Sequence, residues 1–202
     1  MPKVSKAHAE SRRRQIIEAA VDCFSKHGFH GTTMRDIVKA SKLSAGAIYL
    51  YFGSKDDIIE EIARERHAWE RAAIAGSLEQ ADPMDFLGSL AEVFFGTLQD
   101  KNERKMRRLG VQLWAEALRN PRLLRVAQRG IDGPRTTISG FVARAQQTAQ
   151  FPSGLEPDAV ARVLIALFQG FILQQAWNDR TETGPFVAVA RAAFDAMMKL
   201  PR

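Results

Sequence analysis

The sequence predicts an all-α protein, and three observations favour that class. Apolar residues recur with a helical period along the chain, and no segment of useful length alternates as a strand does. Two patterns, Thr33-x-x-Asp36 and Ser54-x-x-Asp57, have the spacing of helix capping boxes. Gly, Pro and Asn residues, which end helices, stand between the apolar segments. Together these features indicate helices joined by short connections.

The first four helices are expected close together in the N-terminal part of the chain. Their predicted spans are 9–26, 33–40, 44–51 and 54 to about 80. Gly28 is the expected C-terminal stop of the first helix, because glycine readily adopts the left-handed backbone that ends helices. Ser44 is a good N-cap for the third helix, and Gly53 ends it.

Five further helices are expected beyond residue 83. Their predicted spans are 83–99, 103–118, 121–150, 157–179 and 186–200. The third of these is expected to be interrupted near 130–134, where two glycines precede a proline. Pro157 suits the first turn of the next helix, since its missing N–H has no partner there anyway.

The net charge of +6 is confined to one end of the chain. Residues 1–55 hold ten Lys and Arg side chains against four Asp and Glu, whereas the remaining residues hold 19 of each sign. Such an asymmetry indicates contact with nucleic acid or an acidic membrane by the N-terminal quarter. A merely solvated basic surface would leave the neutral remainder unexplained.

Composition places the chain among soluble globular proteins. Of its 202 residues 46% are hydrophobic and 26% charged, and the single cysteine, Cys23, cannot form an internal disulfide. The first 15 residues are charged and lack the apolar run of a signal peptide. The most apolar stretch, 159–173, is expected to be too short to span a bilayer. These features predict a cytoplasmic protein without membrane contact, with Cys23 as a buried, inert thiol.

The second and third predicted helices have the length of a helix-turn-helix unit. The second helix of such a unit enters the major groove and presents its N-terminal residues to base edges. Here that end is the small-residue sequence Ser44-Ala45-Gly46-Ala47, and Tyr49 and Tyr51 suit phosphate contacts through their hydroxyls. Lys55 adds a phosphate partner beside a helix N-terminus. A plain helical hairpin with solvated tyrosines is the alternative that length alone leaves open.

From about residue 12 to residue 68, the sequence closely resembles the DNA-binding segment of the TetR (tetracycline-repressor-like) family. The matching motifs are Gly28-Phe29, Gly31-Thr32-Thr33, Asp36-Ile37, Leu43-Ser44-Ala45-Gly46, Ile48-Tyr49-Leu50-Tyr51-Phe52 and Ser54-Lys55. The resemblance implies an N-terminal three-helix, helix-turn-helix DNA-binding domain joined to a helical-bundle effector-binding and dimerisation domain. We expect the first domain at 1–55 (family-type segment 12–72, helix-turn-helix 33–52) and the second at 56–202.

Carried over by position, the family's DNA contacts fall on Thr33, Arg35, Ser44, Ala45, Gly46, Ala47, Tyr49, Tyr51 and Lys55, with Ile48 and Phe52 facing inward. Lys42 stands where the family often has glycine. We hypothesise that Lys42 adopts a positive φ and strengthens DNA binding without reading sequence. The basic N-terminal side chains, including Arg12-Arg13-Arg14, can track the DNA backbone or an adjacent minor groove, although a solvated tail is expected for residues 1–8 without DNA.

The C-terminal part is expected to supply the effector cavity and the dimer interface. Candidate effector contacts are Phe94, Phe95, Trp114, Phe141, Phe168, Phe171 and Gln175. Candidate dimer contacts, on the family's four-helix interface, are Leu164, Leu167, Ile172, Phe194 and Met197. Core packing within one chain is the alternative for any of these residues. The aromatic set predicts a large, mainly apolar effector.

The resulting prediction is a ligand-responsive, sequence-specific transcriptional regulator, a repressor that binds a pseudo-palindromic double-stranded DNA operator as a homodimer. A small-molecule effector is expected to release it through the fourth helix. No catalytic set, metal site or cofactor motif is recognisable in the sequence. Two other classes remain open at this point: a helical enzyme or small-molecule carrier, and a sequence-independent DNA-packaging protein.

Overall fold

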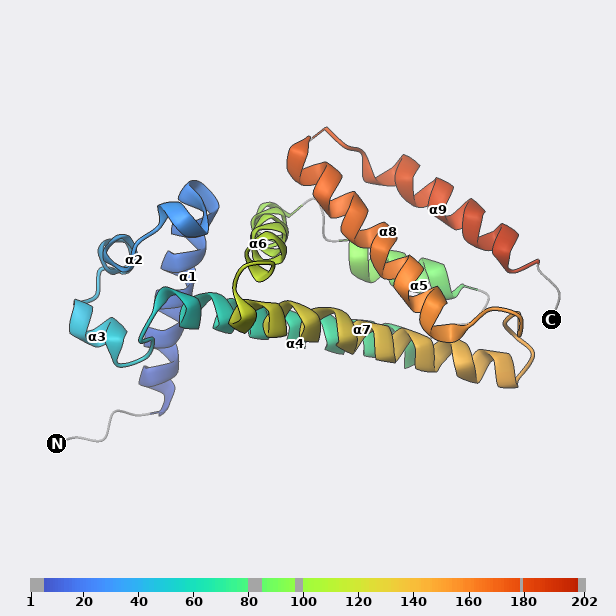
Figure 1. The fold of residues 1–202 in the computed structure, drawn as a ribbon, viewed down its shortest axis with the longest axis horizontal. Helices are drawn as coiled ribbons and strands as arrows, with labels where there is room; N and C mark the ends of the chain where they lie inside the picture. The colour runs from blue at the N-terminus through green and yellow to red at the C-terminus, as the bar shows by residue number, and fades with distance from the viewer. Residues whose placement is uncertain (1–5, 80–84, 97–99, 179, 200–202) are drawn as a thin grey trace.

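The computed structural model describes residues 6–79, 85–96, 100–178 and 180–199, and every regular element among them is a helix. The helices are α1 (Lys6–Gly31), α2 (Met34–Ser41), α3 (Ala45–Tyr49), α4 (Lys55–Glu79), α5 (Phe86–Phe95), α6 (Lys101–Ala117), α7 (Pro121–Gln147), α8 (Pro157–Trp177) and α9 (Thr183–Met197) (Figure 1). The all-α class is confirmed. The helix ends expected at 80, 83, 99, 179 and 200 lie outside the described residues.

Local signals define the N-terminal helices as expected. Gly28, with φ 72° and ψ 172°, is non-helical and breaks α1 three residues before its end. The capping box of Thr33 is complete, because its hydroxyl accepts from the Asp36 amide and the Asp36 side chain accepts from the Thr33 amide. Ser44 caps α3 by accepting from the Ala47 amide. Residues 6–8, expected as part of a tail, already belong to α1.

The helix-turn-helix is held by a core that continues into the rest of the protein. Ile16, Phe24 and Ile37 are buried together with Ile48 of α3. The first turns of α4, with Ile58, Ile59 and Ile62, belong to the same cluster, as do Leu109 and Leu113 of α6 and Leu123 and Val126 of α7. The helix-turn-helix is therefore packed onto α4, α6 and α7 rather than tethered to them.

The long helices α4 and α7 lie side by side along the molecule (Figure 1). The interruption expected near 130–134 was a wrong prediction, since α7 continues through Pro134. The two glycines serve close packing instead. A Cβ on Gly130 would lie 2.3 Å from the imidazole of His67, and one on Gly133 would lie 2.4 Å from the side chain of Arg71. Contact with α4 thus outweighs the local cost of proline in a helix, about 3 kcal/mol.

A second core joins α4, α5, α7, α8 and α9 at the other end of the molecule. α8 has 21 residues and is long and apolar enough to cross a membrane by length and composition alone, a test that a buried core helix also passes. Its Val160, Ala161 and Ile165 are nevertheless buried against the other helices of the bundle. Asp158 near its start is paired with Arg135 and Arg162. The helix behaves as the central helix of a bundle.

Candidate nucleic-acid interface and effector cavity

The N-terminal end of α3 is open to solvent, at the end of the molecule far from α8 and α9 (Figure 1). Ser44, Ala45 and Gly46 are exposed and Ala47 is half-buried. A Cβ on Gly46 would meet nothing within 4 Å, so the protein itself does not require glycine there. Ile48 is fully buried, and Phe52 is 3% exposed, as expected for their inward positions. The helix therefore presents small side chains to solvent, while the buried side chains of Ile48 and Phe52 hold it against the core.

The residues after α3 divide into exposed and half-buried side chains. Tyr49 is 53% exposed. Tyr51 is only half-buried and packs against the N-terminal core, so less of its ring is available to a partner than the sequence indicated. Leu50 is 84% exposed and was absent from the predicted contacts. Its position between two tyrosines of the proposed contact surface was the signal that could have identified it.

Lys42 adopts φ 57° and ψ 25° in the turn between α2 and α3. The expectation of a positive φ is confirmed, and the side chain is exposed. Gln15 of α1 fixes this turn by donating to the Ser41 carbonyl over 2.7 Å. A non-glycine residue in this region stores roughly 1 kcal/mol or more of strain. Lys42 thus holds a positive charge immediately before α3 at a cost to stability.

Thr33 and Arg35, at the start of α2, are both exposed. The Thr33 hydroxyl donates to the Asp36 carboxylate over 2.6 Å, so it is committed to the capping box. These hydrogen bonds from Thr33 lower the pKa of Asp36. Among the residues that the structure describes, Arg35 has no such partner, and its exposed side chain lies at the surface beside α3.

Two predicted DNA-facing cations have structural contacts that the sequence did not reveal. The Lys55 ammonium donates to the carbonyls of Phe29, over 2.5 Å, and Thr32, over 3.0 Å, which joins the start of α4 to the end of α1. One of its three N–H groups remains for a phosphate. Arg13 donates to Glu61 over 3.0 Å and lies over the ring of Phe52. It therefore belongs to the packing of α1 on α4 rather than to a free basic tail.

The acidic start of α4 is neutralised from within the protein. Arg122 of α7 lies 2.6 Å from Asp57 and 2.8 Å from Glu60. Burial raises the pKa of Asp57, but hydrogen bonds from Arg122 and Ser54 outweigh it, and the net pKa is lowered. Both carboxylates are therefore paired with Arg122, which leaves the positive charge of α1–α3 less opposed on the outer face.

A cavity of about 80 Å³, which opens to solvent, lies between α4, α6, α7 and α8, with Phe94 of α5 at its edge. Phe94, Trp114 and Phe168 of the predicted effector set line it. Phe141 lies instead in the distal core, and Phe171 packs against Phe95 and Phe186. Gln175 is not among the lining residues, whereas Gln169 is. Three members of the aromatic set therefore converge on one cavity, and three, Phe95, Phe141 and Phe171, do not.

A charged cluster at this cavity was missing from the sequence analysis. Arg66 lies 2.7 Å from both Glu70 and Glu103, and Arg107 is buried beside them. Burial lowers the pKa of Arg66, but its contacts with Glu103 and Glu70 outweigh this and raise it. Burial also lowers the pKa of His67, which lines the same wall, so His67 is neutral at pH 7. The i,i+4 Arg/Glu spacings on α4 and α6 were the signals available in the sequence.

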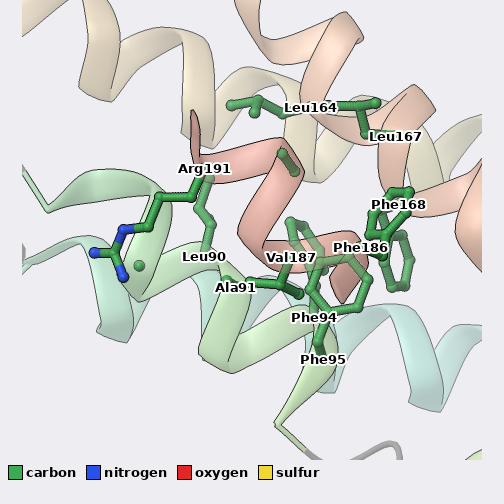
Figure 2. A pocket seen from close by; sticks show the side chains of 12 residues that line it. Leu90, Ala91, Phe94, Phe95, Leu164, Leu167, Phe168, Phe186, Val187 and Arg191 are labelled. Atoms are coloured by element: carbon green, nitrogen blue, oxygen red, sulfur yellow. The ribbon is translucent and has the colours of Figure 1, made fainter. Parts of the chain in front are cut away.

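A second, apolar groove of about 490 Å³ lies between α5, α8 and α9. Figure 2 shows Phe94, Phe95, Phe168 and Phe186 gathered at one end, with Arg191 pointing away at the other. Phe94 and Phe168 stack with centroids 4.5 Å apart and line both spaces. This pair therefore forms part of the wall between the charged cavity and the groove.

The predicted dimer contacts divide between the chain's own core and its surface. Leu164, Ile172 and Phe194 are buried within the chain's own core, so their expected role as dimer contacts stays a prediction. Leu167 is 40% exposed, and Met197 is half-buried. Further exposed apolar residues on α8 and α9 are Val163, Trp177 and Val189, at 58%, 76% and 72% exposure. Because α8 is apolar nearly all round, its sequence did not reveal which face is open.

The fold and the exposed α3 define a helix-turn-helix DNA-binding regulator. Comparison with known proteins supports this class. Residues 16–62 match the bacterial regulatory proteins of the tetR family, and residues 88–199 match the C-terminal domain of BetI-type transcriptional repressors. The chain belongs to the TetR family, with a C-terminal domain of the BetI type.

The similarity to individual relatives extends along nearly the whole chain. The transcriptional regulator UidR of Escherichia coli (strain K12) is 26% identical over 194 residues, which cover 94% of each chain. The structure of GusR from Salmonella enterica has a TM-score of 0.79 at 26% identity and covers 98% of this chain and 99% of that one. FadR of Bacillus subtilis, solved with stearoyl-CoA, has a TM-score of 0.76 at 20% identity and covers 92% and 97%.

The protein is therefore a ligand-responsive transcriptional regulator of the repressor type and not an enzyme. Regulators of this family bind DNA operators and small-molecule effectors. This finding sets aside the enzyme, carrier and packaging alternatives that composition alone left open.

Proposed function

We propose that two copies of this chain bind a pseudo-palindromic operator, each with α3 in a major groove. The observation that carries this proposal is the open N-terminal end of α3 between two exposed side chains, Lys42 and Tyr49. Ser44 and Ala47 then face base edges, where a hydroxyl can hydrogen-bond and a methyl can contact thymine. Lys42, Tyr49 and Arg35 bind phosphates and set the register.

The dimer places the two recognition helices about one DNA turn apart, roughly 34–36 Å. We propose that the open faces of α8 and α9 meet in this dimer. Val163, Leu167 and Val189 are exposed there beside a groove of about 650 Å³ of empty space. A contiguous apolar face of this kind is typical of an interface between subunits. We expect such a regulator in the cytoplasm.

The effector binds in the cavity between α4, α6, α7 and α8 in this proposal. α6 connects this cavity to the DNA-binding unit. On its cavity side it carries Arg107 and Trp114, and on its other side the Gln112 side chain accepts from the Phe29 amide over 3.0 Å. Glu116 lies 2.7 Å from His30. Movement of α6 on ligand binding would therefore displace the end of α1, in addition to any effect through α4.

Effector release follows as a shift between two arrangements of α1–α3. Only the arrangement with the correct separation of the recognition helices fits both half-sites, so a ligand that favours the other arrangement lowers DNA affinity. Both α4 and α6 belong to the core that supports α3, through Ile58 and Leu109 among others. In this proposal the ligand thus acts through helices that are packed against α1–α3.

The test is selection of binding sites from random DNA, followed by footprinting. The wild-type protein is expected to select two inverted half-sites whose centres lie about one turn apart. Replacing Ala47 by a larger polar residue, as in Ala47→Asn, is expected to change the selected bases at one position of each half-site. The matched variant Ala75→Asn, at a half-buried position of α4 away from α3, is expected to select the wild-type sequence. Selection of the same sequence by Ala47→Asn would contradict the placement of α3.

A further inference from the structure

Arg107 is a buried cation whose hydrogen-bonding capacity is only partly used. Its side chain is 6% exposed and lines the cavity between α4, α6, α7 and α8. One terminal nitrogen, Nη2, donates to the Phe94 carbonyl over 2.7 Å. Nε and Nη1 are buried without a hydrogen-bond acceptor. Buried N–H groups of a charged side chain rarely remain without acceptors, because the loss of water is then uncompensated.

The carboxylate nearest to Arg107 does not meet this need. Glu103 lies 3.8 Å from Arg107 Nε, which is beyond hydrogen-bonding distance, and its Oε2 is itself buried without a donor. Its other oxygen accepts from Arg66 over 2.7 Å. Arg66 also holds Glu70. In this cluster Arg66 is therefore fully paired with Glu70 and Glu103, whereas Arg107, which lines the cavity, lacks hydrogen-bond acceptors.

The remainder of the cavity wall beside Arg107 is apolar and aromatic. The guanidinium lies 5.0 Å from the centroid of Phe168, which stacks on Phe94. Trp114, Leu113 and Ile165 complete this part of the wall. A ligand seated against this part of the wall would meet the hydrogen-bond donors of Arg107 beside carbon surface, while Arg66, His67, Glu70 and Gln169 are the other polar side chains that line the cavity. Burial, together with the nearby charge of Arg66, lowers the pKa of Arg107 to about 10, which leaves it charged at neutral pH.

We infer that the effector is a small organic acid, with its carboxylate bound by Arg107 and its apolar body against Phe94, Trp114 and Phe168. This inference rests on the proposal that the cavity is the effector site, and it adds a charged group to the mainly apolar ligand that the aromatic residues indicated. A carboxylate supplies Nε and Nη1 of Arg107 with acceptors at hydrogen-bonding distance, which Glu103, 3.8 Å from Nε, does not. A hydroxyl or N–H on the same ligand would serve Oε2 of Glu103.

The experiment compares a carboxylate with neutral molecules of the same shape. The probes are 3-phenylpropionate, 3-phenylpropionamide and 3-phenylpropan-1-ol, together with the same three head groups on an octyl chain. Binding to the DNA-free protein is measured by calorimetry at pH 7. At least one of the two acids is expected to bind on the order of ten- to a hundredfold more tightly than its neutral partners, since hydrogen bonds between ions are the stronger ones.

Variants of Arg107 test whether this side chain causes the preference for the acid. Arg107→Met is expected to lose the preference for the acid, whereas Arg107→Lys, which keeps a positive charge, should recover part of it. Arg108→Met, on the exposed side of the same helix, is the matched control and should retain the wild-type preference. Melting temperatures verify folding, and Arg107→Met should fold, because Glu103 keeps Arg66 as its partner.

Two results would overturn the inference. One is equal binding of acids and neutral analogues, or no binding of either acid at millimolar concentration. The other is an unchanged preference in Arg107→Met. Because these measurements contain no DNA, they are separate from the operator experiment. Failure to select an operator would contradict the proposed function, while loss of acid preference alone would contradict only the nature of the ligand.

Discussion

Replacing Lys42 by glycine is expected to stabilise the fold and to weaken DNA binding at the same time. The residue has φ 57° in the turn between α2 and α3, where glycine has no steric penalty. Its side chain is exposed immediately before the recognition helix. A single substitution therefore removes both backbone strain and a proposed phosphate contact, and the two effects have opposite signs.

The magnitudes follow from the local geometry. Relief of a left-handed conformation contributes about 1–2 kcal/mol, while the greater freedom of glycine in the unfolded chain costs about 0.5–1 kcal/mol. The net expectation for Lys42→Gly is a gain of about 0.5–1 kcal/mol, or about 1–4 °C in melting temperature for a chain of this size. Loss of one phosphate contact per subunit lowers the salt slope of DNA binding by about 1.8 for a dimer.

The assays are thermal unfolding and a salt series of DNA binding. Lys42→Ala is the matched control, because it loses the charge but retains the strained backbone. It should show the reduced salt slope without the gain in melting temperature. Lys42→Arg should show neither change. If Lys42→Gly melted at or below the wild-type temperature, the strain argument would fail. An unchanged salt slope in both uncharged variants would refute the phosphate contact.

Three further predictions concern stability and communication. Hydrogen bonds from Arg64 lower the pKa of Glu61 from an ordinary 4.5 to about 2. The ionised Glu61 therefore stabilises the fold fully above pH 4.5, and this contribution is lost as the pH falls towards 2. In urea unfolding, Glu61→Gln should lower the free energy of unfolding by about 2–3 kcal/mol at pH 7 and flatten its dependence on acid pH. Gly130→Ala should destabilise by about 1–3 kcal/mol, whereas Gly76→Ala, with open space around it, should stabilise by about 0.5–1 kcal/mol; equal effects would contradict the close helix contact. Gln112→Ala should lower the free energy of unfolding by about 1–3 kcal/mol, because it leaves the buried amide of Phe29 without its acceptor. The same variant should show less release of DNA on ligand binding. Full release would show that α6 is not needed.

The local structure of the N-terminal helices was predictable because short-range rules decide it. The caps at Thr33 and Ser44 and the stop at Gly28 depend only on neighbouring residues. The inward position of Ile48 follows from the helical period. The caps, the Gly28 stop and the position of Ile48 require no knowledge of which helices pack together, whereas the positive φ of Lys42 was expected from the resemblance to a family that often has glycine there, and Gln15 of α1 holds that turn.

Features set by packing between distant helices were not predictable. The continuity of α7 past Pro134 depends on its close fit against α4, where Gly130 meets His67. The unsatisfied Arg107 follows from the position of α6 beside α4 and α5, and its i,i+4 partner Glu103 gave no hint that the pair would be buried. Sequence pattern therefore indicated an apolar cavity but not its charged wall.

The dimer face illustrates the same limit on α8. Leu164 and Ile172 are more hydrophobic candidates by type than Val163, yet both are buried in the chain's own core. An apolar residue on every side of a helix gives no preferred direction. Only the packing of α8 on α6 and α7 decides which side remains open.

The most direct test of the central claim is the ratio of affinities for the selected operator and a shuffled duplex of the same composition, measured across a salt series. A sequence-reading α3 predicts a preference of at least about a thousandfold at physiological salt. Tyr49→Ala should reduce binding to both duplexes, because it removes a phosphate contact and no base contact. Equal, salt-sensitive binding of the wild type to both duplexes would contradict the claim that this protein reads DNA sequence.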